Sequence, residues 1–64
     1  MIDYNKYIGK KVFIITLKNN KYSGEVIGVD DRDPILTFIE IKDKFGEDII
    51  FCVSELAKFQ VVRE

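Results

Sequence analysis

The sequence has no histidine, no tryptophan and a single cysteine, Cys52. Histidine and cysteine are the usual protein ligands of zinc and other transition metals, so we expect no such metal site and no metal cofactor. One cysteine cannot form an internal disulfide, whereas small secreted domains usually depend on several. We therefore expect a cytoplasmic protein whose fold does not rely on disulfides.

Long apolar runs are also missing. No stretch approaches the ~20 apolar residues that a membrane-spanning helix needs. The first residues, Met1 to Lys6, lack the charged start and apolar centre of a secretory signal peptide. These absences predict a protein with no membrane association.

The residues that would build an active site are scarce as well. Without histidine there is no Ser/His/Asp or Cys/His set, and no glycine-rich phosphate loop or convergent acid/base pair can be assembled. Cys52 lies in an apolar stretch with no neighbouring cation, where cysteine behaves as a small hydrophobic residue. We expect neither an enzyme nor a bound cofactor.

What the chain does contain is typical of one folded domain over residues 1–64. Of its 64 residues, 47% are hydrophobic and 33% are charged, and the formal net charge is −1. The balanced charge excludes a domain coated in basic residues for nucleic acid, but it allows a local basic patch. A chain this short buries only ~60% of its unfolded surface, so its stability as a monomer is marginal.

The apolar segments predict an all-β fold, a five-stranded and strongly bent small barrel. Each expected strand is rich in β-branched or aromatic residues and is bounded by turn residues. A short N-terminal helical segment over residues 2–9, capped by Asp3 and ended by Gly9, precedes them. The expected strands are Lys11 to Lys18, Lys21 to Val29, Ile35 to Lys42, Asp48 to Val53 and Lys58 to Arg63.

Turn and bend residues lie between and within these strands. Asn19 and Asn20 predict a tight hairpin, because asparagine tolerates positive φ, and Gly46 predicts a second such position. Gly24 and Gly28 indicate a bulge or a sharp bend inside the second strand. Ser54 is expected to cap a helical turn before the last strand.

Some strands are apolar on both faces. In the first strand Val12 and Ile14 alternate with Phe13 and Ile15, and the stretch 49–53 has no polar side chain at all. A small barrel has one interior, so the N-terminal segment, another subunit or a partner must cover the second face. The alternative is that bent strands bury both faces within one chain. We expect self-association, because a small chain gains burial from neighbours.

The stretch from Gly9 to Asp30 resembles the first sequence motif of the Sm-like (LSm) family. The motif has a tyrosine two residues before a glycine, an apolar residue two after it and an aspartate six after it. Tyr22, Gly24, Val26 and Asp30 stand at these positions. The stretch 50–59 is similar in outline to the second Sm motif, so the resemblance covers nearly the whole chain, as in the short, divergent prokaryotic members.

The resemblance implies a bent barrel with an N-terminal helix that assembles into a closed homo-oligomeric ring. In the family the fourth strand of one subunit pairs with the fifth strand of the next, which removes the unpaired sheet edges. The interface residues implied for this chain are Ile49, Ile50, Phe51, Val53, Phe59 and Val61.

The same resemblance implies RNA as a partner, but this chain departs from the family's uridine pocket. Pro34 stands about where a base-contacting asparagine is usual, and Cys52 and Val53 replace an arginine and a glycine. A basic stripe with tyrosines nearby is the remaining indication of RNA contact, through phosphates and stacking. The candidate nucleic-acid residues are Lys10, Lys11, Lys21, Tyr22 and Arg32.

Three alternatives stay open at this point. The lysines are also typical of residues that keep strand edges soluble. The domain is also consistent with a protein-interaction module of the same barrel type, one that adds or caps strands on a partner protein. Asp30, Asp31 and Asp33 are compatible with a divalent cation, although a solvated loop is the simpler interpretation of their spacing.

Overall fold

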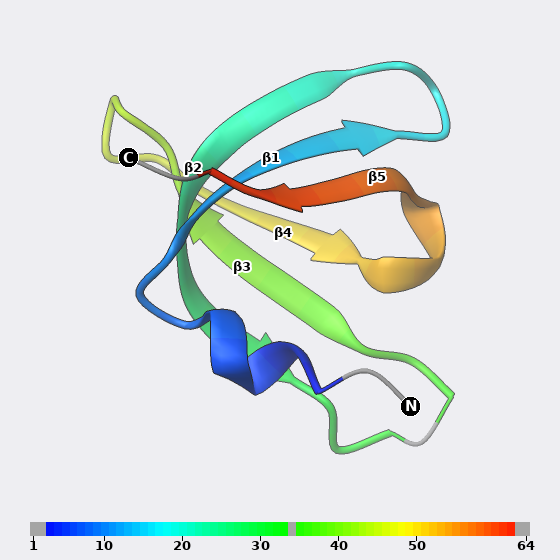
Figure 1. Cartoon of the computed structure of the whole chain (residues 1–64). Coiled ribbons are helices and arrows are strands. Elements are labelled where there is room, and N and C mark those ends of the chain that lie inside the picture. Colours follow the sequence, from blue (N-terminus) through cyan, green and yellow to red (C-terminus); the bar gives the residue numbers. More distant parts are fainter. Residues whose placement is uncertain (1–2, 34, 63–64) are drawn as a thin grey trace.

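The computed structural model describes residues 3–33 and 35–62 and contains five strands and two short 3-10 turns (Figure 1). The predicted all-β class is confirmed. Pro34 and Arg63, which the sequence places in a loop and at the end of the last strand, lie outside the described residues. In chain order the elements are η1 (Tyr4–Tyr7), β1 (Lys11–Thr16), β2 (Lys21–Asp30), β3 (Phe38–Lys42), β4 (Asp48–Cys52), η2 (Val53–Glu55) and β5 (Leu56–Val61).

The five strands form one antiparallel sheet in the order β4-β3-β2-β1-β5. The sheet curls around its inner face, with the long strand β2 bending most visibly (Figure 1). Strands β4 and β5 are its two edges, and no ladder joins them in the described part of the chain. Closure of the strands into a barrel is therefore not confirmed.

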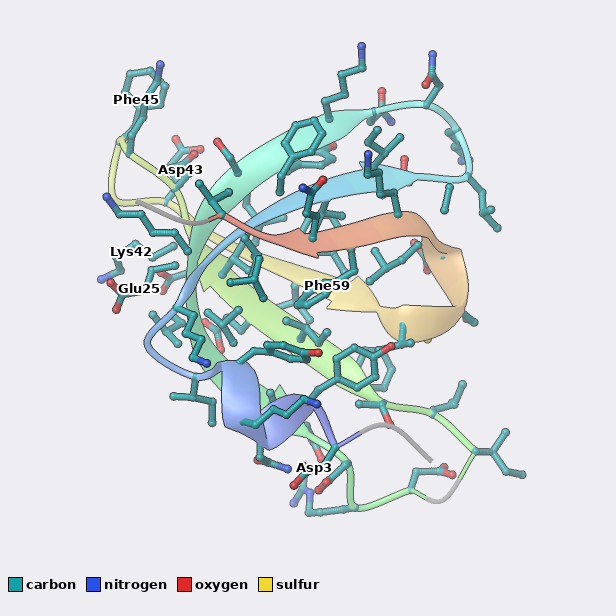
Figure 2. All side chains as sticks on the ribbon, in the orientation of Figure 1. Asp3, Glu25, Lys42, Asp43, Phe45 and Phe59 are labelled. Atoms are coloured by element: carbon teal, nitrogen blue, oxygen red, sulfur yellow. The ribbon has the colours of Figure 1, made fainter. Side chains whose placement is uncertain are left out.

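The predicted N-terminal helix is one turn of 3-10 helix. Asp3 caps it as expected, since its carboxylate accepts a hydrogen bond from the backbone N–H of Asn5 at 3.0 Å. Two tyrosine rings of this segment pack against Phe59, whose ring points from β5 toward η1 (Figure 2). The ring centroids of Tyr4 and Tyr7 lie 5.5 Å and 5.0 Å from that of Phe59. A segment too short to be stable alone is thus held by aromatic packing.

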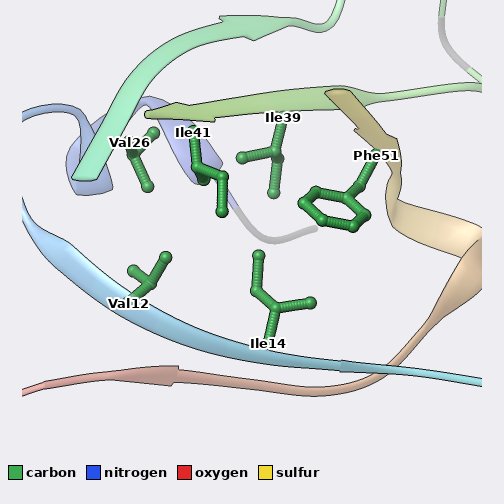
Figure 3. Packing of buried hydrophobic residues seen from close by; sticks show 6 residues of the cluster. All are labelled: Val12, Ile14, Val26, Ile39, Ile41 and Phe51. Atoms are coloured by element: carbon green, nitrogen blue, oxygen red, sulfur yellow. The ribbon is translucent and has the colours of Figure 1, made fainter. Parts of the chain in front are cut away.

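The core lies on the inner face of the curled sheet (Figure 3). Alternate residues of a strand point to one face, and on this face the alternating positions are aliphatic or aromatic. Partly buried residues such as Tyr22 and Val61 extend this core toward its rim. The buried members are Val12, Ile14, Val26, Ile39, Ile41 and Phe51.

The predicted turn residues take the conformations that their chemistry favours. Asn19 has φ of 65° in the turn between β1 and β2, and Gly46 has φ of 80° in the turn between β3 and β4. The register of β2 against β3 shifts between Val26 and Gly28. This shift is the bulge that Gly28 predicted inside the second strand. Local residue chemistry therefore sets both hairpins.

Several predictions about segment ends are wrong. The first strand ends at Thr16 and not at Lys18, and the last strand begins at Leu56 and not at Lys58. The third strand begins at Phe38 and not at Ile35, because the Asp33 carboxylate accepts hydrogen bonds from the backbone N–H groups of Ile35 and Leu36 at 2.8 Å and 3.3 Å. These bonds hold the chain in a turn. Ser54 does not cap η2: the cap position belongs to Cys52, and no side chain makes a capping hydrogen bond there.

Candidate assembly interface

The free edge of β4 carries an unpaired row of backbone groups. The N–H of Val53 donates to the carbonyl oxygen of Thr37 on the β3 side, at 2.8 Å. Backbone groups alternate between the two sides of a strand, so the N–H groups of Phe51 and Ile49 also point toward β3. The N–H groups of Cys52 and Ile50 then point away from the sheet, where β4 has no neighbour among the described strands.

The free edge of β5 is built in the same way. The N–H of Val62 donates to the carbonyl oxygen of Lys11 at 2.9 Å, which places Val62 and Gln60 on the side that faces β1. By the same alternation the N–H groups of Val61 and Phe59 point to the open side. The molecule therefore offers two strand edges of similar length, and each of them is ready to pair with another strand.

The side chains expected at an oligomer interface all lie on or next to these two strands, but they differ in exposure. Ile50 is 64% exposed on the outer face, whereas Phe51 is only 6% exposed and belongs to the core. The ring of Phe59 is covered by the N-terminal tyrosines. In a strand-pairing interface Phe59 would thus contribute mainly backbone groups, whereas the backbone N–H of Phe51 already points toward β3. Ile49, Val53 and Val61 are half-buried.

The lysines expected to contact nucleic acid are not gathered at one place. Lys10 and Lys11 lie at the start of β1, where Lys11 is opposite Glu25 of β2. Lys21 is opposite Ile15, at the other end of the same hairpin. Ile15 lies four positions after Lys11 in β1, which is roughly 13 Å at the usual rise per residue.

The other two candidate nucleic-acid residues are engaged within the chain. The ring of Tyr22 packs against that of Phe51, with centroids 5.0 Å apart and planes at 61°. The guanidinium of Arg32 donates to both carboxylate oxygens of Asp30, with Nε and Nη2 at 3.0 Å and 2.8 Å. This bonding lowers the pKa of Asp30 and raises that of Arg32.

The three aspartates of the β2–β3 loop do not converge on a common point. Asp30 binds Arg32, Asp33 accepts from backbone N–H groups, and Asp31 accepts from the side-chain amide of Asn5 at 3.0 Å. That amide also donates to Asp3, so it ties the loop to the N-terminal turn. Within residues 3–33 and 35–62 no group of three or more potential ligand side chains could hold a metal ion.

Cys52 lies at the end of β4 and is partly buried, with its sulfur 3.1 Å from the hydroxyl oxygen of Ser54.

Across residues 3–33 and 35–62, no helix has the length and apolar character needed to cross a membrane.

The outer face of the sheet holds a feature that the sequence interpretation missed. Phe38 and Glu40 of β3 point outward beside Ile50 of β4, because Glu40 pairs with Ile50 in the ladder. The alternation of β3, with Ile39 and Ile41 buried, is a signal from which this placement could have been predicted.

Comparisons with protein-family models, with curated proteins and with solved structures found no match to this chain.

Proposed function

We propose that the chain is an Sm-like protein that functions as a non-catalytic scaffold by assembling into a homo-oligomeric ring. The observation that carries the proposal is the strand order, which leaves β4 and β5 as the two sheet edges. These are the strands that the sequence resemblance pairs between neighbouring subunits. A closed ring would give every edge a partner, and each subunit would complete the small barrel of the next.

The exposed apolar side chains add support. Ile50 is 64% exposed on an edge strand, beside backbone groups that have no ladder partner among the described strands. A neighbouring strand β5 would cover the backbone row and shield part of that side chain. For a chain of 64 residues this added burial is a substantial gain in stability.

The positions of the basic residues favour the scaffold over RNA binding as the main role. Lys11 and Lys21 lie at opposite ends of one hairpin, and Arg32 is bound to Asp30. If RNA does bind to the ring, then its affinity falls steeply with salt and on replacing Lys10, Lys11 and Lys21.

The proline variant Ile50→Pro tests the proposed interface. Proline is tolerated on an edge strand where its missing N–H would face outward, so the fold is expected to survive. The variant lacks the donor that the β4 edge would offer to a neighbouring subunit. We expect light scattering after size exclusion to show an oligomer for the native protein and a monomer for Ile50→Pro.

The matched control is Ile50→Val, which keeps the backbone N–H and most of the side chain. It should assemble like the native protein, and circular dichroism should show the same β content for all three. Unchanged assembly of a folded Ile50→Pro variant would contradict pairing through this edge.

A module that adds a strand of a partner protein to its sheet is the second candidate function, since an open β4 edge beside an exposed Ile50 accepts any complementary strand. The two candidates differ in the purified protein. The ring predicts an oligomer of one chain alone, and the module predicts a monomer until its partner is added.

A further inference from the structure

The outer face of the sheet carries a groove along β3 that shares Ile50 with the proposed assembly interface. Two adjoining hollows, of about 550 Å³ and about 270 Å³, share Asp30 and Phe38 as lining residues. The larger one continues to Leu36 in the loop before β3, and the smaller one continues to Glu40 and Ile50. Together they form one path from the loop to the β4 edge, which we call the outer groove.

The outer groove has an apolar floor. Phe38 is 37% exposed, Leu36 is 41% exposed and Ile50 is 64% exposed, although all three are large hydrophobic side chains. Gly28 lies beneath the smaller hollow and adds no side chain to fill it. A connected apolar strip of this kind on a folded surface marks an interaction site more often than scattered hydrophobic residues do.

Glu40 supplies the main polar feature of the groove. Its side chain is half-buried, and a carboxylate oxygen lies 3.8 Å from the position that a Cβ on Gly28 would occupy. Among residues 3–33 and 35–62 no cation forms an ion pair with it, and the nearby Arg32 and Lys42 pair with Asp30 and Asp48. A half-buried carboxylate without a cation beside it favours a ligand that brings one.

The charged side chains that line the outer groove are mostly acidic. Asp30, Asp33 and Glu40 line the two hollows, against the single guanidinium of Arg32, which is bound to Asp30. An acidic rim around an apolar strip complements a segment that combines apolar and basic side chains and disfavours phosphate.

The spacing of the groove residues limits the shape of such a segment. Phe38 and Glu40 are two residues apart on one face of β3, roughly 7 Å along the strand, and Leu36 precedes them by two more residues. An extended peptide presents alternate side chains at the same interval. Leu36, Phe38 and Glu40 would then meet two apolar side chains followed by a basic one.

We propose that the outer groove binds an extended peptide segment of a partner protein in which two alternate apolar side chains are followed by a lysine or arginine. The apolar side chains lie on Leu36 and Phe38, and the basic group pairs with Glu40. The proposal does not depend on the ring, because its main contacts are Leu36, Phe38 and Glu40, which lie on β3 and the loop before it and not on the β4 and β5 edges.

The test is a titration of the full chain with a capped heptapeptide, Arg-Ser-Leu-Ser-Leu-Ser-Arg, which offers a basic end in either direction. Amide shifts of the protein are followed by nuclear magnetic resonance. We expect saturable changes confined to Gly28, Phe38, Glu40 and Ile50 and their neighbours. Two matched peptides, one with glutamate for arginine and one with serine for leucine, should each bind more weakly.

Two protein variants separate the charge of Glu40 from a general effect of charge. Glu40→Gln should weaken the affinity for the arginine peptide about fivefold, in the range expected for a partly exposed ion pair. Glu47→Gln, which removes a carboxylate from the exposed turn between β3 and β4, should leave the affinity unchanged. Both spectra report directly whether the variant is folded.

Several results would overturn the proposal. They are the absence of saturable shifts with the arginine peptide, equal binding of the glutamate peptide, and equal affinity of Glu40→Gln. Concentration-dependent shifts of the same amides without peptide would assign the groove to a second copy of the chain. Saturation of the same amides by oligouridylate would assign it to RNA.

Discussion

Gly24 illustrates how one residue permits the curvature of the sheet. A Cβ atom placed on this glycine would collide with the carbonyl oxygen of Lys42 at the end of β3. Backbone atoms cannot move aside as a flexible side chain can, so the strands approach closely only because the side chain is absent.

The variant Gly24→Ala should therefore be destabilised by about 2 kcal/mol, as expected for overpacking against a rigid neighbour. Urea unfolding followed by circular dichroism measures the effect. The control is Gly28→Ala, whose Cβ would meet no atom closer than 3.8 Å and should change the free energy of unfolding by less than about 0.5 kcal/mol. Equal stability of the two variants would contradict this role of Gly24.

The pair formed by Asp30 and Arg32 predicts a pH dependence. Hydrogen bonds from the Arg32 side chain, then from its backbone N–H, hold the pKa of Asp30 below its usual value. A carboxyl whose pKa is lowered by folding stabilises the protein above its unfolded pKa of about 3.9. That contribution is lost as the pH falls through the folded pKa.

The variant Arg32→Gln should raise the pKa of Asp30 toward the usual value, which carbon-detected titration of the carboxyl group measures. It should also reduce stability slightly at neutral pH, and the difference should vanish in acid. The energetic effect is small because the Arg32 side chain is 90% exposed. An unchanged Asp30 titration in Arg32→Gln would mean that the bond is absent in solution.

At the scale of elements, Phe59 joins the N-terminal turn to the edge strand β5. Its ring contacts those of Tyr4 and Tyr7, and it packs against the core from a half-buried position. The variant Phe59→Ala should lose roughly 2 kcal/mol of stability, less than for a fully buried phenylalanine, and η1 should detach.

Phe45 provides the comparison for that variant. It projects from the turn between β3 and β4, is 79% exposed, and points away from the sheet (Figure 2). Phe45→Ala should change the free energy of unfolding by less than about 0.5 kcal/mol. Denaturant unfolding of both variants, with tyrosine fluorescence as the probe for η1, tests the assignment. Similar losses in both would refute it.

An element can be predicted from the sequence when the cause of its conformation lies in its own residues. Asn19 and Gly46 could be read as turn residues because positive φ is a property of the residue itself. The start of β3 was predicted too early, because hydrogen bonds from the Ile35 and Leu36 backbone to Asp33 are a particular geometry that composition does not reveal.

The candidate site was harder to predict because it depends on register between distant strands. Lys11 and Lys21 are close in the sequence, but hairpin pairing places them at opposite ends of the strands. Glu40 lies beside Ile50 because of the ladder between β3 and β4. Such neighbours emerge only when the strand order is known.

At the scale of the whole molecule, the chain is a curled sheet with a small core and two open edges. Within residues 3–33 and 35–62 the buried core consists of six side chains, while several large hydrophobic residues are exposed. The net stability of a domain of this size is small. Strand pairing between copies would add burial and remove both edges. Assembly is thus the central claim of the proposed function.

Native mass spectrometry of the wild-type protein as purified tests that claim most directly, since it reports subunit number and any retained nucleic acid together. We predict one closed assembly of several chains with a fixed stoichiometry. A monomer over the full range of protein concentrations would contradict the ring and leave the open edges of β4 and β5 to a partner protein.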